Sequence, residues 1–293
     1  MIRIGYAGVN TELPSASRTF RLAGYSVQRM LGTASANIEA LERILEWNAD
    51  RGISLFRITS NLVPFGSHPV NRGEWKQALR HGFARIGRFI RDRGMRVSMH
   101  PGQYSVLNSP HEQTHRNTLR DLAYHETVLS LMELDFRHKV VIHGGGAYGN
   151  KAKAARTLVE RLSELDSRVR RRLVLENDER VFTAQDILAV CLESQVPGAL
   201  DVFHHRVLTR FPGMSTREVV EAFAPTWAGD RQKIHYSSQE PGKAPGSHSS
   251  HVDIGAFGVF YETVSDLDLD IMLEVKDKQA SVLALRKAFP GLK

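Results

Sequence analysis

The stretch SMHPGQY, residues 98–104, indicates how this chain is built. The apolar run at residues 95–99 predicts a buried strand that delivers His100 at its end, where a proline and a glycine then break the chain. Gln103 and Tyr104 follow at once on the turn, so a metal-ligand type of side chain and a polar–aromatic pair share one short loop. A histidine at a strand end is common in protein cores. However, a ligand-type side chain stands at one predicted strand end after another.

Strands and helices alternate along the whole chain, a pattern typical of parallel βαβ units. Hydrophobic spacing predicts strands at residues 2–7, 53–58, 95–99, 139–142, 172–175, 199–202, 233–236 and 270–273. After an irregular insertion at residues 8–36, it predicts helices near residues 37–51, 74–93, 116–134, 151–165, 184–193, 215–222, 254–264 and 278–288. The count, the spacing and the chain length favour an α/β fold, a single (β/α)8 TIM barrel that forms one domain over residues 1–293.

An open, doubly wound sheet is the alternative, and such sheets commonly carry a glycine-rich phosphate turn after the first strand. The turn GYAGVN at residues 5–10 lacks the G-x-G-x-x-G spacing of that motif. The run GGGAYG at residues 144–149 lacks the Lys-Ser/Thr pair of a P-loop. We therefore interpret these glycines as backbone that makes room for its neighbours.

Charge and composition limit the classes of function. The chain has 293 residues and a formal net charge of +7, which fits a polyanionic partner, although many basic proteins bind no nucleic acid. It has no apolar run of about 18 residues, so we expect no membrane span. The single cysteine, Cys191, cannot form an internal disulfide. With no signal peptide expected at the N-terminus, this composition predicts a cytoplasmic protein.

Ligand-type residues stand at or just after the predicted strand ends, which is where such barrels place their active sites. Nine side chains are expected to converge on this rim: His68, His100, His143, Glu176, Asp201, His204, His235, His248 and Glu274. They exceed what one metal ion can bind, and imidazole with carboxylate is a ligand set for zinc, manganese or iron. Two or three divalent ions in one site suit phosphodiester hydrolysis, because they activate water and stabilise the leaving oxygen.

Other basic features are interpreted as structural. Five histidines are predicted on helices or their flanks and are expected to be solvated: His81, His111, His115, His125 and His138. The run RVRRR at residues 168–172 has the composition of a nucleic-acid patch. It precedes the fifth strand, however, and therefore belongs to the end of the barrel opposite the site, where we expect a solvated face.

With these residues in view, the chain resembles the UV damage endonucleases, a family related in fold and metal site to endonuclease IV and xylose-isomerase-like barrels. The similarity covers nearly the whole chain, in the blocks IRIGYAGVN, NADRGISLFRITSNLVPFGSHP, SMHPGQY, VIHGGGAYGNK, LVLENDE, DVFHH, KIHYSSQ, PGSHSSH and IMLEVKDK. Together these blocks are far more specific than a generic barrel pattern. One departure is Gly144, where relatives often carry a larger residue; it concerns local packing and not the neighbouring ligand.

The resemblance implies a distribution of the ligands over three ions. His100, His143 and Glu176 would hold one ion, with His68 close by. Glu176 would bridge to a second ion. That ion would also take Asp201, His235 and Glu274. His204 and His248 would hold a third.

The resemblance also implies the catalytic set and the metal. Glu176, Glu274, Lys233 and His235 would carry the chemistry, and the lysine at this position can be carboxylated in the family. Two or three divalent ions are expected. Manganese is the preferred metal, with zinc, magnesium or cobalt as alternatives.

For the substrate, the resemblance implies damaged double-stranded DNA. Gln103 and Tyr104 are similar to the pair that probes damaged bases, and Tyr6 and Asn10 would bind substrate on the same rim. The expected reaction is a nick immediately 5′ of UV photolesions, both cyclobutane pyrimidine dimers and 6-4 photoproducts. It would leave 3′-hydroxyl and 5′-phosphate ends. A monomer in the bacterial cytoplasm, associated with the nucleoid during repair, is the expected form.

Three alternatives share features of this pattern. An abasic-site endonuclease of the endonuclease IV type would use the same metals on another lesion, and the Gln103–Tyr104 pair favours the UV interpretation over it. A sugar isomerase on the same barrel needs fewer ligands and no basic rim. A non-enzymatic DNA-binding barrel has no reason to keep nine ligands.

Overall fold

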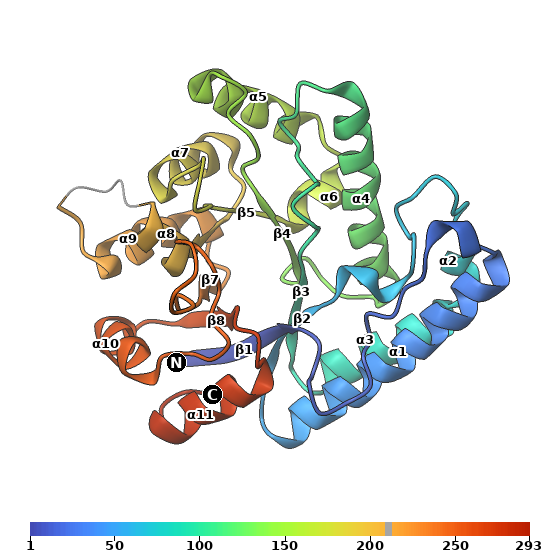
Figure 1. Cartoon of the computed structure of the whole chain (residues 1–293), viewed down its shortest axis with the longest axis horizontal. Coiled ribbons are helices and arrows are strands. Elements are labelled where there is room, and N and C mark those ends of the chain that lie inside the picture. The colour runs from blue at the N-terminus through green and yellow to red at the C-terminus, as the bar shows by residue number, and fades with distance from the viewer. Residues whose placement is uncertain (209–212) are drawn as a thin grey trace.

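Eight parallel strands close into a barrel in the computed structural model, which describes residues 1–208 and 213–293 (Figure 1). The strands are Ile2–Gly8 (β1), Leu55–Ile58 (β2), Arg96–Met99 (β3), Lys139–His143 (β4), Leu173–Glu176 (β5), Gly198–Asp201 (β6), Gln232–Tyr236 (β7) and Leu269–Leu273 (β8). Each strand pairs in parallel with the next one in the sequence, and β8 pairs with β1. The predicted eight-stranded barrel is confirmed.

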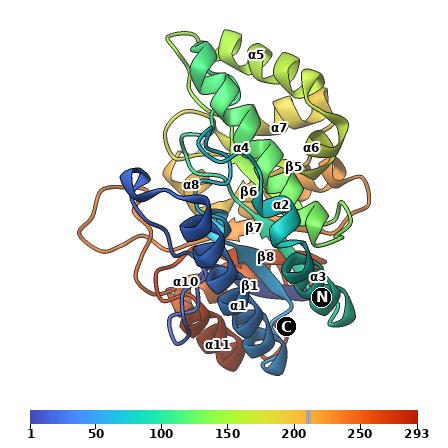
Figure 2. The ribbon, with the colours of Figure 1, turned by 90° about the vertical axis from the view of Figure 1, so that its right-hand side faces the viewer.

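Helices surround the strands, as Figures 1 and 2 show. They are Val27–Asp50 (α1), Trp75–Ala78 (α2), Arg80–Asp92 (α3), Glu112–Leu131 (α4), Lys151–Glu164 (α5), Ser167–Arg172 (α6), Ala184–Ser194 (α7), Val202–Val207 (α8), Thr216–Phe223 (α9), Ile254–Val264 (α10) and Gln279–Ala288 (α11). The helix predicted near residues 74–93 is in fact two, α2 and α3, and the short helices α6 and α8 were not expected. Among the described residues, no helix has the length and the apolar composition needed to span a bilayer.

The first long helix begins ten residues before the position that the sequence indicates. Ser26 caps α1 by accepting a hydrogen bond from the main-chain N–H of Arg29. Asn37, which was predicted to be the cap, lies inside the helix and is fully buried. Its side-chain amide instead donates to the carbonyl oxygens of Arg18 and Leu62, and so holds the loops after β1 and β2 against the helix. The predicted irregular insertion is therefore shorter than residues 8–36.

The two ends of the barrel differ in what covers them. Both chain ends lie at the amino-terminal side, where the main-chain N–H of Ile4 donates to the carbonyl oxygen of Lys293 at 2.7 Å. The long loops after β1 (blue) and β7 (orange) extend on the other side, at the left of Figure 2. The carboxyl ends of the strands therefore open among long loops, which leaves that rim available for a site.

A buried carboxylate organises the amino-terminal floor of the barrel. Asp270 on β8 is fully buried and accepts hydrogen bonds from Arg3 at 2.6 and 2.7 Å and from Arg96 at 2.7 Å. The Nε atom of Arg231 lies 2.9 Å from the same carboxylate. Burial alone would raise the pKa of Asp270, but Arg3 and Arg96 hold that pKa below its ordinary value.

Three residues predicted to be solvated are buried instead. His125 is 0% exposed and His138 is 5% exposed, and the Nδ1 atom of His138 accepts from the main-chain N–H of Val97 at 3.1 Å. Arg172, the last residue of the RVRRR run, is 1% exposed. It donates to the carbonyl oxygens of the chain that leads into β4, including that of His138 at 3.0 Å. The run does lie at the floor, as expected, but Arg172 closes the floor and does not face solvent.

Replacing Asp270 by Asn should destabilise the fold by about 3–5 kcal/mol, because three buried or half-buried guanidinium groups lose their shared anion. Urea unfolding at neutral pH measures this. Since the pKa of Asp270 is lower in the folded state than in the unfolded one, its contribution is complete above the unfolded value of about 3.9 and is lost as the pH falls further. The deficit of the variant should therefore shrink in acid.

Asp268→Asn is the matched control. Its carboxylate pairs with Arg231 at 2.6 Å, but its side chain is 65% exposed, so the loss should stay below about 1 kcal/mol. Equal losses in the two variants would contradict the role assigned to Asp270.

Candidate metal centre

The structure brings together seven of the nine predicted ligands at the carboxyl rim: His100, His143, Glu176, Asp201, His204, His235 and Glu274. Strand register explains much of this. His143 on β4 stands beside Glu176 on β5, and Asp201 on β6 stands beside His235 on β7. The remaining members directly follow β3 and β8 or lie on α8, one turn after the end of β6.

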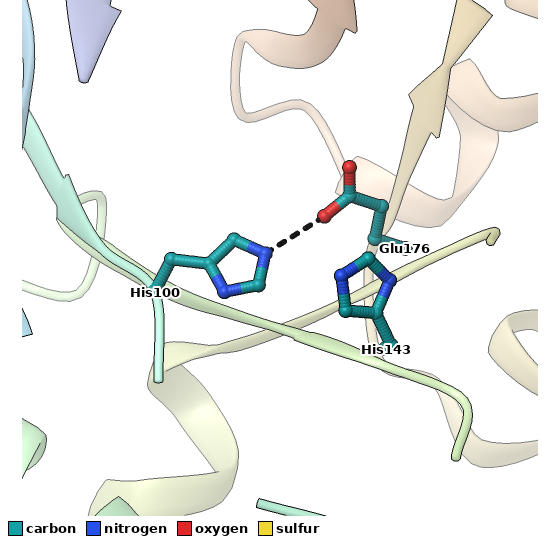
Figure 3. A group of neighbouring side chains, drawn as sticks. All are labelled: His100, His143 and Glu176. Carbon is teal, nitrogen blue, oxygen red and sulfur yellow. Dashed lines mark hydrogen bonds and ion pairs between the residues drawn. The ribbon is translucent and has the colours of Figure 1, made fainter. Parts of the chain in front are cut away.

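Glu176 is common to three groups of ligand atoms, each with its atoms within 4.8 Å of one another. The groups are His100–His143–Glu176, Glu176–Asp201–His204 and Glu176–His235–Glu274. The two carboxylate oxygens of Glu176 face different sides. Oε2 lies 3.0 Å from Nε2 of His100 (Figure 3), and Oε1 lies 2.5 Å from Nδ1 of His235. A carboxylate shared in this way suits a bridge between neighbouring cations.

Hydrogen bonding to backbone carbonyls determines which ring nitrogen of two histidines carries the proton. A carbonyl oxygen only accepts, so Nδ1 of His100 donates to Pro101 at 2.8 Å, and Nδ1 of His248 donates to the carbonyl of Glu274 at 2.7 Å. The Nε2 lone pairs of these rings then point at Glu176 and at Nε2 of His204, the latter at 3.2 Å. Such lone-pair contacts call for a cation or a proton between the atoms, and outer carbonyl partners are typical of metal-binding histidines.

Further observations fit a bound divalent ion. The Nδ1 atom of His143 and the Oδ2 atom of Asp201 are buried and have no hydrogen-bond partner among the described residues. Burial would raise the pKa of Glu176, but His235 and His143 hold it well below its ordinary range. Burial, opposed by His204, raises the pKa of Asp201 to about 7. Imidazole and carboxylate donors of this kind suit zinc or manganese.

Arg57 is part of the site although the sequence did not point to it. It lies on β2 and is 9% exposed. Its Nη2 atom donates to Oε1 of Glu274 at 2.5 Å and to Nε2 of His235 at 2.9 Å. Burial would raise the pKa of Glu274, and Arg57 and His235 instead hold it far below its ordinary value. The feature of the sequence that could have revealed Arg57 is that a charged residue stands inside the otherwise apolar strand LFRI.

Two predicted ligands stay outside the three groups. His68 is exposed, and its Nδ1 atom accepts from the main-chain N–H of Val70 at 3.1 Å. His248 contacts the cluster through His204, and its Nδ1 atom lies 3.8 Å from Oε2 of Glu274. The structure thus keeps His204 and His248 together, as expected for a third ion, while His68 lies on the loop beyond β2.

Lys233 occupies the barrel interior. It is fully buried, stands beside Asp270 in the strand register, and its Nζ atom has no hydrogen-bond partner among the described residues. Burial, together with the nearby charge of Arg96, lowers its pKa well below the ordinary value for lysine. Because side chains alternate along a strand, Lys233 shares the inward face of β7 with His235.

The four predicted substrate-binding residues divide into two pairs. Gln103 and Tyr104 are exposed on the loop after β3, Tyr104 by 68%. Tyr6 and Asn10 are buried, at 0% and 2% exposure. The hydroxyl of Tyr6 donates to Asn48 at 2.7 Å and accepts from Asn10 at 3.1 Å, so this pair ties the loop after β1 to α1. Burial raises the pKa of Tyr6 to about 12.

Gly144, the departure in the sequence, is explained by packing. A Cβ atom there would lie 2.8 Å from Ile187 and 2.9 Å from Phe182. The loop after β5 and helix α7 thus approach the end of β4 too closely for a larger residue. His143 keeps its place at the rim in this arrangement.

Comparison with known proteins gives one consistent result. A family model described as UV-endonuclease UvdE matches residues 2–293. The UV DNA damage endonuclease of Clostridium perfringens is 36% identical over 288 residues, which cover 96% of this chain and 69% of that protein. A crystal structure of SacUVDE matches with a TM-score of 0.94 and 38% identity, over 99% of this chain and 98% of that one.

A more distant structure shares the fold alone. Endonuclease IV from Thermus thermophilus matches with a TM-score of 0.58 at 14% identity, over 97% of this chain and 98% of that one. The barrel is therefore common to both, whereas the sequence similarity over the whole length is with the UvdE relatives.

Manganese should raise the melting temperature of the metal-free protein, because a ligand that binds only the folded state stabilises it by about 2.7 kcal/mol at 100 times its Kd. Glu176→Gln should lose most of this shift, since Glu176 belongs to all three groups. Glu42→Gln, which alters a surface pair with Arg85, should keep it. Thermal unfolding after chelator treatment, with stepwise addition of Mn²⁺, measures the difference. An equal rise in melting temperature in both variants would show that Glu176 does not bind the metal.

Proposed function

Because the chain belongs to the UV-endonuclease UvdE family, we propose that this DNA endonuclease is metal-dependent and nicks duplex DNA immediately 5′ of UV photolesions. The products would carry a 3′-hydroxyl and a 5′-phosphate. The observation that carries the proposal is the position of Glu176, shared by three ligand groups on the rim from which Gln103 and Tyr104 project. We further expect a monomer that works in the cytoplasm at the nucleoid.

The three ligand groups support the binding of two or three divalent ions, with manganese preferred over zinc, magnesium or cobalt. His100 and His143 would hold one ion with Glu176, and the other two groups would share the same carboxylate. His248 would join through its contact with His204, and His68, on the loop beyond β2, would be a further ligand. When bound, such ions supply an activated water and stabilise charge on the phosphate and the leaving oxygen.

The chain's own side chains orient this chemistry. Arg57 holds Glu274 and His235 in fixed positions through its two short hydrogen bonds. Glu176 remains ionised because its histidine neighbours hold its pKa low, so both of its oxygens can act as cation ligands. Burial lowers the pKa of Lys233 and so favours the neutral amine, which is the form that reacts with carbon dioxide to give a carbamate and a proton. Carboxylated Lys233 would add one more anion to the interior.

The exposed pair on the loop after β3 supports recognition of distorted DNA. A photolesion weakens stacking, so the duplex costs less free energy to bend and to open at that point. An exposed aromatic ring replaces lost base stacking and is worth about 1–3 kcal/mol per base. Tyr104 supplies that ring, and Gln103 beside it supplies an amide that can hydrogen-bond to base edges. The net charge of +7 favours contact with phosphates.

A duplex oligonucleotide with one cyclobutane dimer should be nicked by the wild-type protein with Mn²⁺. Glu274→Gln should lower the rate at least about 100-fold, because one ligand is lost and Arg57 is left without its carboxylate partner. Glu262→Gln, an exposed position on α10, should cut normally. Absence of a nick by the wild-type protein, or an undiminished rate of nicking by Glu274→Gln, would contradict the proposal. An abasic duplex cut in preference to the dimer would favour the abasic-site alternative.

Tyr104→Ala should lower the preference for damaged over undamaged duplex about tenfold, because the stacking ring is lost while the metal ligands are untouched. Tyr104→Phe keeps the ring and should keep the preference. Competition binding with damaged and undamaged duplexes, alongside metal analysis of each variant, makes the comparison. Unchanged discrimination by Tyr104→Ala would refute the probe role.

A further inference from the structure

The loop that follows β3 is exposed in its middle and buried at its ends. Gln103 and Tyr104 face solvent, whereas Pro101 and Ser105 on either side are buried. We call residues 100–105 the β3 loop. It begins at His100, a member of the metal groups, so the same six residues carry a ligand and the exposed pair.

The near end of the β3 loop is held through a serine that follows the neighbouring strand. The hydroxyl of Ser60, just after β2, donates to the main-chain carbonyl oxygen of His100 at 2.6 Å. The Nε2 atom of His125 on α4 lies 2.9 Å from that hydroxyl oxygen. The Nδ1 atom of His125 donates to the main-chain carbonyl oxygen of Asp121 at 2.6 Å, and burial lowers the pKa of this ring. Its Nε2 atom is therefore an acceptor that shares the Ser60 hydroxyl proton with the carbonyl of His100. His125 is fully buried, so its ring fixes where Ser60 points.

The far end of the loop is held by the same helix. The hydroxyl of Ser105 donates to Oδ2 of Asp121 at 2.6 Å, and the two residues are 6% and 4% exposed. The main-chain N–H of Ser105 closes a turn onto the carbonyl of Gly102 at 2.9 Å. Asp121 and His125 are four residues apart, which puts them on one face of α4.

Packing alone does not hold the exposed part of the loop. A cavity of about 490 Å³ opens beside it, lined among others by His68, Tyr104 and Asp121. With open space on that side, the hydrogen bonds at the two ends of the loop, to Ser60 and to Asp121, help to restrict it.

We infer that Asp121 and His125 are positioning residues, which hold the β3 loop at both ends so that Gln103 and Tyr104 stand at a fixed place relative to His100. The predicted effects on DNA binding rest on the proposed function, whereas the predicted restraint of the loop does not. Neither side chain belongs to the ligand groups found among the described residues. The metal centre therefore does not explain why these two polar groups are buried.

A loop held in its binding conformation loses less freedom when it meets DNA. Ordering one flexible side chain costs enough to weaken binding severalfold, and two such side chains are involved. Freeing the far end should therefore raise the Kd for lesion duplex about tenfold. The near end acts next to a ligand, so freeing it should change metal affinity instead, since outer partners of ligands typically contribute about 10–100-fold.

The far end is tested with Ser105→Ala, Asp121→Ala and Asp121→Asn, each loaded with Mn²⁺. The two alanine variants should bind lesion duplex about tenfold more weakly, while Asp121→Asn, which keeps an acceptor for Ser105, stays within about threefold of wild type. The double alanine variant should be no worse than either single one, because both remove the same contact. Metal content should not change in any of them.

Amide hydrogen exchange in the absence of DNA measures the mobility of the β3 loop directly. The N–H groups of Ser105 and Val106, which donate to Gly102 and to Thr118 at 2.9 Å each, should exchange faster in Ser105→Ala. Thr127→Ala is the matched control on α4, because its hydroxyl donates only to the carbonyl of Ala123. Unchanged exchange and unchanged affinity in Ser105→Ala overturn the inference. A wild-type protein that cuts no lesion, with the exchange result intact, overturns the proposed function and leaves the loop restraint standing.

The near end is tested with Ser60→Ala. Manganese binding, followed by thermal shift, should weaken about tenfold, while the ratio of affinities for damaged and undamaged duplex stays as in wild type. His125→Leu should reproduce this, and His125→Gln, which retains a side-chain acceptor for the Ser60 hydroxyl, should recover part of it. Wild-type metal affinity in Ser60→Ala overturns the role assigned to the near end.

Discussion

The burial of the Glu176 carboxylate determines which kinds of side chain must surround it at the rim. It is 1% exposed at the end of β5, and an isolated buried carboxylate is too costly to keep ionised without several compensating groups. The compensation comes from His100, His143 and His235, delivered by three other strands. Only a closed barrel of parallel strands brings those ends to one point. Closure of the barrel and the grouping of these side chains around Glu176 are therefore linked.

Strand ends were predictable from the sequence because apolar runs of about four to eight residues followed by polar residues mark them well. That reasoning was right for the barrel, and it named the seven side chains that the structure gathers at the rim. It missed Arg57, because a short strand pattern does not say which side faces the barrel interior. It also expected His125 and His138 in solvent, since an isolated polar residue on a helix or in the loop beyond it carries no sign of what packs on it. Loop positions such as that of His68 depend on contacts distant in sequence.

Charge inside the barrel is arranged in layers, and the layers explain the state of Lys233. At the floor, both carboxylate oxygens of Asp270 already accept from Arg3 and Arg96. Asp270 is thus no full partner for Lys233, although the two stand side by side in the register. Burial without a full anionic partner disfavours the charged amine and lowers the pKa of Lys233. The interior therefore changes from a guanidinium-rich floor, through a lysine of lowered pKa, to carboxylates and imidazoles at the rim.

The stretch SMHPGQY joins two tasks with opposite physical needs. In the proposed function, His100 would bind metal, which requires fixed geometry, whereas Tyr104 would test DNA, which requires the exposure that it has. Exposure normally brings mobility, because an exposed loop has few packing contacts. Here the exposed pair lies only three and four residues after His100, and both ends of the loop are hydrogen-bonded, one to half-buried Ser60 and the other to buried Asp121. These bonds restrain the backbone on both sides of Tyr104. Under the proposed function, damage recognition and the metal centre would therefore share one restrained loop.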